Sequence, residues 1–194
     1  YERHDNKPQK RSKDEIISIL KNEKDSLVLL TALNDIREYN INEFADLLIW
    51  FMGRKNINAF VATYPLLLLV HGGYDQTVSF TKNAKLYSVV PKKLEPPFVN
   101  ENYQSVIRIV EQVAKDPSIS EVAISLLNEL IIILYPDNIF DIEINLLSGA
   151  LLSLAYEHFQ IKRDDEALSQ RLNINKNLLK DINYGALKMQ ISVT

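Results

Sequence analysis

The sequence predicts an all-α fold built of antiparallel helices, arranged either as a helical repeat or as a helical bundle. The 194 residues include only five glycines and seven prolines, which favours long regular elements over strands and turns. Hydrophobic residues make up 46% of the chain and supply enough material for a continuous core. Apolar residues recur at helical spacing along both halves, and capping signals precede several of these runs.

The first half, residues 12–73, contains candidate helix starts near positions 12, 26, 42 and 58. Ser12 and Glu15 have the spacing of a capping box, and Asn42 is the expected N-cap of the third helix. Pro65 predicts a kink or a fresh start in the fourth. The even spacing suits antiparallel helices joined by short turns. In this rhythm the chain resembles armadillo and HEAT repeats.

Three segments of this half also resemble a second family. They are residues 18–20, 32–36 and 44–48, whose matching positions are mainly apolar helix positions. They are similar to the opening armadillo-type helices of the ARID-family subunits of SWI/SNF-class chromatin remodellers. The resemblance implies a scaffold inside a large nuclear assembly.

Two further stretches are expected to lie outside the helical halves. Residues 1–11 are polar and basic and predict a flexible N-terminus. Residues 74–100 interrupt the helical pattern and predict a loop that can include a short hairpin. Within them, the proline-rich residues 91–97 are the best candidate linker. The two helical halves are then separate, or residues 101–194 form one continuous domain with residues 12–73.

The second half, residues 101–194, is more regular. Ser118 and Glu121 have capping-box spacing before a long apolar helix, and Asp164 or Asp165 is expected to cap a short one. This short helix, a three-residue turn and the helix from Lys176 have the length and spacing of a helix-turn-helix. In that arrangement four basic residues are candidates to contact nucleic-acid phosphates: Arg171, Lys176, Lys180 and Lys188.

From Tyr103 onwards the five expected helices resemble one repeat of the cyclin fold, as found in TFIIB-type initiation factors. The residues that carry the resemblance are 146–158, Ile161, 168–170, Leu172, Ile174 and the closing helix from Asn177. The resemblance implies a nucleic-acid-associated module that acts in transcription. This is the alternative to a protein-binding function.

The composition limits the chemistry that we expect. The chain has no cysteine, and its three histidines lie far apart, so we predict no metal site, no cofactor and no enzymatic activity. The absence of cysteines and of glycosylation sequons predicts an intracellular protein of the nucleus or cytoplasm. The longest apolar runs, such as residues 66–70, are shorter than the roughly 20 residues of a membrane span, so none is expected.

The sequence therefore predicts a non-catalytic scaffold or adaptor that binds other protein subunits. The chain begins at Tyr1, so we expect it to be a fragment of a larger subunit. Nucleic acid is a possible but less favoured partner, because the net charge is only −3. A bundle that encloses a lipid or small molecule is a third class, although no small-molecule substrate is evident. Aromatic residues dominate binding hot spots, and the candidate exposed anchors are Trp50, Phe51, Tyr87 and Phe98.

Overall fold

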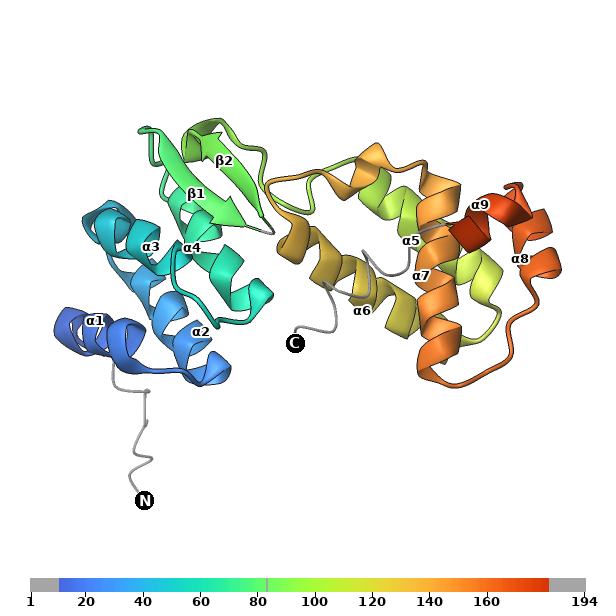
Figure 1. Ribbon diagram of the computed structural model, residues 1–194, viewed down its shortest axis with the longest axis horizontal. Coiled ribbons are helices and arrows are strands. Elements are labelled where there is room, and N and C mark those ends of the chain that lie inside the picture. The colour runs from blue at the N-terminus through green and yellow to red at the C-terminus, as the bar shows by residue number, and fades with distance from the viewer. Residues whose placement is uncertain (1–10, 83, 182–194) are drawn as a thin grey trace, which may run out of the picture. The chain divides into compact units, whose positions relative to one another are not determined.

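The computed structural model describes residues 11–82 and 84–181, and these residues are mostly helical (Figure 1). The predicted all-α character is confirmed in this coarse form, with one two-stranded sheet among the described residues. The chain divides into an N-terminal unit, Tyr1–Pro96, and a C-terminal unit, Pro97–Thr194. Whether the helices form an armadillo or HEAT repeat stays a prediction.

The N-terminal unit contains four α-helices that pack around a shared apolar core. Two 3-10 turns, Ile36–Glu38 and Ile41–Phe44, lead from the second helix to the third. The first helix packs on the second and the third, and the fourth packs on the second and the third, so all four helices contribute to one core. The helices are α1 (Lys13–Asn22), α2 (Ser26–Asp35), α3 (Ala45–Met52) and α4 (Ala59–His71).

Local side-chain hydrogen bonds fix where the first helices begin. The predicted capping box is confirmed: the Ser12 backbone N–H donates to Glu15 Oε2 at 2.7 Å, and the Glu15 N–H donates to Ser12 Oγ at 3.3 Å. Asp25 caps α2 by accepting from two backbone N–H groups. Asn58 caps α4 in the same way. These short polar side chains satisfy donors that have no partner within the helix.

One predicted cap in this unit is wrong. Asn42 is not a helix N-cap, because Asn40 accepts from the Asn42 N–H and starts a 3-10 turn before α3. The Asn42 side chain instead donates to the Gly72 carbonyl at 3.3 Å. Of the two alternatives expected at Pro65, a kink or a fresh start, the fresh start is absent, since α4 continues through this residue. Pro65 is buried together with Leu66, and apolar burial offsets the backbone hydrogen bond that proline cannot donate.

A β-hairpin occupies part of the predicted loop. Strands β1 (Val78–Lys82) and β2 (Lys85–Val89) pair antiparallel, with Phe80 opposite Tyr87. These two rings stack with centroids 5.1 Å apart, and both are buried. The hairpin packs on α3, and the following turn, Pro91–Lys93, packs on α4. Much of residues 74–96 therefore belongs to the N-terminal unit.

The C-terminal unit is built on three long helices followed by a short helical pair. Its core joins apolar residues of the first three helices, and the third packs on both of the others (Figure 1). The short pair covers one side of the third helix. The helices are α5 (Asn102–Ala114), α6 (Pro117–Leu134), α7 (Ile144–His158), α8 (Asp165–Leu172) and α9 (Lys176–Asp181).

Helix α6 begins earlier than the sequence predicted. Ser118 is not the N-cap, because Asp116 accepts from the Ser118 N–H at 2.9 Å and Pro117 is the first helical residue. Proline fits that position, since its missing N–H would have no partner there in any case. Among the described residues, α6 alone is long and apolar enough to cross a membrane by length and composition. Core helices meet the same criteria of length and composition, and α6 packs on α5 and α7 as a core helix does.

The short helical pair approaches α7 at a glycine. The left-handed Asn173, at φ 53° and ψ 44°, ends α8, and α9 begins three residues later. A Cβ atom at Gly149 would lie 2.8 Å from Leu179 Cδ1 and 3.0 Å from Leu172 Cδ1. The missing side chain is therefore what lets this pair lie close to α7.

Candidate functional site

Two of the four predicted interaction anchors are exposed. Trp50 is 48% exposed on α3, and Phe98 is 40% exposed at the start of the C-terminal unit. The prediction of exposure is wrong for Phe51 and Tyr87, which are 0% and 8% exposed. Phe51 lies on the inner face of α3, three residues after the buried Leu48. Tyr87 is on the buried face of the hairpin, beside Phe80.

Arg54 supports the exposed Trp50 ring from behind. Its guanidinium carbon lies 5.9 Å from the centroid of the Trp50 ring and 5.3 Å from that of Phe51. The same guanidinium donates to the carbonyls of Leu20, at 2.6 Å, and Glu23, at 2.9 Å. These carbonyls belong to the end of α1. The Arg54 guanidinium is thus held by two hydrogen bonds to the end of α1 and by contacts with two aromatic rings of α3. The exposed Trp50 ring therefore packs against a side chain whose position is fixed.

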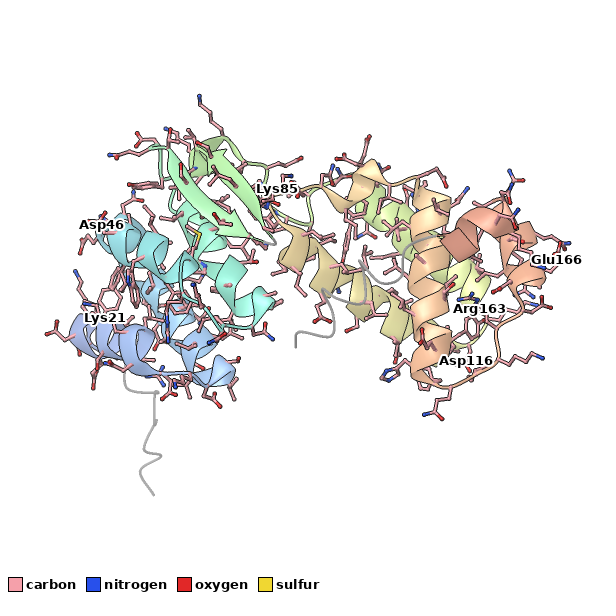
Figure 2. The ribbon with its side chains drawn as sticks, in the orientation of Figure 1. Lys21, Asp46, Lys85, Asp116, Arg163 and Glu166 are labelled. Atoms are coloured by element: carbon pink, nitrogen blue, oxygen red, sulfur yellow. The ribbon has the colours of Figure 1, made fainter. Side chains whose placement is uncertain are left out.

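A charged residue lies one helical turn from Trp50. Asp46, labelled in Figure 2, is exposed on α3, and a spacing of four residues places it on the same side of the helix as Trp50. Trp50 is thus an exposed aromatic side chain with a charged neighbour, and tryptophan is among the residues most enriched at protein-binding hot spots.

Phe98 makes an edge-to-face contact with Tyr103. The ring centroids are 5.6 Å apart, and the Tyr103 hydroxyl donates to Asn128 Oδ1 at 2.8 Å. Val99, 57% exposed, follows Phe98. The Phe98 ring therefore contacts Tyr103 of α5 and is partly exposed to solvent.

The predicted phosphate-contacting residues lie in different surroundings. Arg171 Nη1 donates to the Val113 carbonyl at 3.3 Å, which places it at the end of α5. Lys176 forms an ion pair with Glu166 at 2.8 Å. The hydrogen bond from Lys176 lowers the pKa of Glu166, and the same bond raises the pKa of Lys176. The side chain of Lys180, and Lys188 as a whole, lie outside the described residues.

Sequence reasoning missed an open pocket at the ends of α5 and α7 and the start of α8. Its volume is about 340 Å³, and it adjoins a second hollow of about 450 Å³ that shares Tyr156, Lys162 and Arg163. No local signal marks it, because its residues come from two stretches far apart in the chain, residues 114–115 and 156–171. The charged and aromatic residues that line it are Lys115, Tyr156, Lys162, Arg163, Asp164 and Arg171 (Figure 2 labels Arg163).

The buried hydroxyl groups serve the helices that carry them. Ser148 and Ser153 each donate to the carbonyl four residues earlier, at 2.7 and 2.6 Å. Thr63 does the same, and Ser169 donates to the carbonyl three residues earlier. Within residues 11–82 and 84–181, no group of three His, Asp or Glu side chains is placed to hold a metal ion.

Comparison of the chain with protein-family models, with curated protein sequences and with solved structures found no match.

Proposed function

We propose that this chain is a non-catalytic protein-binding module, a scaffold or adaptor that works within a larger intracellular assembly. The observation that carries the proposal is the half-exposed Trp50 ring, supported by an arginine that is itself anchored to the end of α1. An exposed aromatic residue on a fixed support loses little conformational freedom when a partner covers it. Tryptophan is also among the residues most enriched in binding hot spots.

The proposal extends to the kind of assembly. The regular succession of α1 to α4 supports an armadillo- or HEAT-like repeat, a fold class that offers extended surfaces to partners. A subunit of a nuclear chromatin or transcription assembly is the finer form of the proposal, and it rests on the sequence resemblances alone.

An affinity purification from native extract tests the proposal, with nuclease treatment to remove partners held by nucleic acid. We expect a set of nuclease-resistant protein partners that is lost with Trp50→Ala and kept with Trp50→Phe. Leu86→Ala is the matched control, because Leu86 is 73% exposed in the same unit but belongs to β2 and not to α3. Partners that bind all three variants equally would exclude Trp50 as the anchor.

The chain offers a direct spectroscopic check of the same site. Trp50 is its only tryptophan, so its emission reports on this position alone. Addition of a captured partner should shift that emission to shorter wavelength, because the indole leaves water. An unchanged spectrum with a saturating partner would show that binding occurs elsewhere.

A second candidate function is nucleic-acid binding, favoured by the α8–turn–α9 geometry with its left-handed Asn173. If α9 contacts DNA, affinity should fall steeply as salt rises and should be reduced by a Lys176→Ala, Lys180→Ala double variant. Lys176 would have to leave Glu166 to reach a phosphate, so Glu166→Gln should strengthen binding. If neither the double lysine variant nor Glu166→Gln alters DNA affinity, the hypothesis that α9 contacts DNA is excluded.

A further inference from the structure

The pocket at the ends of α5 and α7 contains positive charge that the fold does not use. Arg171 already donates to the Val113 carbonyl at 3.3 Å, and the Tyr156 hydroxyl lies 3.5 Å from the Ala114 carbonyl. The C-terminal carbonyls of α5 are therefore partly satisfied without further cations. Among the described residues, Lys115 and Lys162 line the pocket with no hydrogen-bond or ion-pair partner for their ammonium groups.

Asp164, the acidic side chain that lines the pocket of about 340 Å³, is engaged by α8. It caps this helix by accepting from the Glu166 N–H, at 3.1 Å, and the Ala167 N–H, at 3.0 Å. Next to the pocket, Asp165 forms an ion pair with Arg163, which lines it. Lys115 and Lys162 are therefore placed to bind an incoming anionic group such as a carboxylate.

The backbone at Lys115 is unusual for the residue it carries. Lys115 follows the last residue of α5 at φ 61° and ψ −27°, a left-handed conformation that glycine adopts at the least cost. Gln160, which lines the adjoining hollow, also has a positive φ, of 55°. Lysine at position 115 thus carries a conformational cost that glycine would not carry.

The adjoining hollow adds an apolar surface. Ile161 lines it and is 48% exposed, and Phe159 is 42% exposed two residues earlier. The aromatic ring of Tyr156 lines both hollows. A ligand that fills the two hollows therefore meets Lys115 and Lys162 in the first and the apolar side chain of Ile161 in the second.

We propose that this pocket binds an acidic peptide segment of a partner protein, with a carboxylate at Lys115 and Lys162 and a neighbouring apolar side chain against Ile161. The combined space has the size of a few amino-acid side chains. A nucleic-acid strand fits less well, because Glu157 and Asp164 line the same hollows and repel a continuous row of phosphates, whereas a peptide can place one carboxylate at the two lysines and uncharged residues beside Glu157 and Asp164. The site is separate from Trp50 and does not depend on that proposal.

Selection of short random peptides displayed on phage against the full chain tests the proposal. We expect enrichment of Asp or Glu beside a large apolar residue. The selected peptides should bind Lys115→Ala, Lys162→Ala about 3- to 30-fold more weakly, since two exposed ion pairs are lost. The matched control is Lys92→Ala, Lys93→Ala, which removes the same charge at exposed positions of the N-terminal unit and should bind like the original chain.

Lys115→Gly separates recognition from structure. Glycine relieves the left-handed backbone, so this variant should unfold at a higher temperature and yet bind the peptides more weakly. If Lys115 only stabilises the end of α5, the substitution leaves peptide affinity unchanged. Trp50→Ala should bind the peptides normally, which distinguishes this site from the one proposed above.

Three outcomes would overturn the proposal. One is a selection without binders or without acidic enrichment. Another is equal affinity for the two double-lysine variants. The third is displacement of the peptides by a single-stranded oligonucleotide at lower concentration than by free acidic peptide, which would assign the pocket to nucleic acid.

Discussion

Arg54 connects the end of α1 to α3 through one side chain. It donates to two carbonyls at the end of α1 and packs under two aromatic rings of α3. Planar guanidinium groups suit such a role, because they donate in a fork while their faces stack on rings. The orientation of α1 against α3 and the support of Trp50 thus depend on the same residue.

Arg54→Ala should lower the free energy of unfolding by about 2 kcal/mol, since hydrogen bonds from a charged donor are lost at partly buried carbonyls. Urea denaturation followed by circular dichroism measures the change. Arg54→Lys should recover less than half of it, because an ammonium group cannot donate in a fork and stack at the same time. Full recovery by lysine would show that charge alone matters.

The Glu166–Lys176 ion pair gives a pH-dependent contact between α8 and α9. Its hydrogen bond lowers the pKa of Glu166, so the contact is present above pH 4.5 and is lost as pH falls through the lowered pKa. Titration followed by the NMR signal of the Glu166 carboxyl carbon should show a midpoint below 4.5. In Lys176→Ala the midpoint should move up towards the ordinary value. Identical midpoints in both proteins would mean that the pair does not form in solution.

Helix caps show which residue-scale features the sequence predicted. Ser12 and Asn58 were predictable, because each is a single good cap in front of an apolar run. For α8 the sequence left Asp164 and Asp165 as alternatives, and the structure has Asp164 as the cap. The wrong caps, Asn42 and Ser118, each have a competing cap two residues earlier. At both positions the sequence contains two acceptable capping residues, and packing or a following proline decides which of them caps the helix.

At the scale of elements, Gly149 controls how closely the helical pair α8–α9 lies on α7. The atoms that a Cβ would meet are the methyl ends of leucines, which can move. Alanine would also favour the helix by about 1 kcal/mol over glycine. The contacts with the leucines disfavour a side chain at position 149, whereas helix propensity favours one. The size of the side chain therefore decides whether stability changes.

Gly149→Ala should therefore change stability little, whereas Gly149→Leu should destabilise the C-terminal unit by about 1–3 kcal/mol through overpacking. Urea unfolding gives both values. Amide hydrogen exchange should show faster opening of α9 in the leucine variant. Wild-type exchange in Gly149→Leu would mean that α9 does not pack on this residue.

The β-hairpin is the element that the sequence described least well. Alternating Val78 and Phe80 match a strand, but only five residues carry the pattern on each side. The glycine-poor turn gives no strong signal either. Burial of Tyr87 could not be predicted, because it depends on where the hairpin packs, and that is a tertiary contact.

At the scale of the whole chain, the boundary between Pro96 and Pro97 separates two compact units. Each has its own buried core, so each is expected to fold as a cooperative unit. The proline-rich residues 91–97 predicted a division in this region from composition alone. The position of the hairpin before the boundary was not visible in that signal.

Limited chymotrypsin digestion should cut first after Phe98, which is exposed and just beyond the boundary. We expect two fragments that keep helical circular dichroism and unfold cooperatively on their own. Phe98→Ala should slow this cleavage and leave the rest of the digestion pattern unchanged. Rapid degradation of either half to small peptides would show that it needs the other for stability.

The candidate sites also differ in how far the sequence could find them. Trp50 was predictable, because one aromatic residue beside an apolar helical stripe stands out. Lys115 and Lys162 were not, since they meet only after α5, α7 and α8 have packed. Arg171 was noticed for its charge, but the structure places its guanidinium at the end of α5.

The paired strands β1 and β2 form the whole of the sheet within the described residues, so each strand has an outer edge that no other strand covers. Such edges present backbone donors and acceptors to any extended chain that approaches. Short length and the lysines beside the turn, Lys82 and Lys85, discourage that approach. Conditions that loosen the hairpin from α3 would expose an apolar face as well, and intermolecular strand pairing would then start at this hairpin. If the protein self-associates at high concentration, we expect this hairpin to be the segment where the pairing starts.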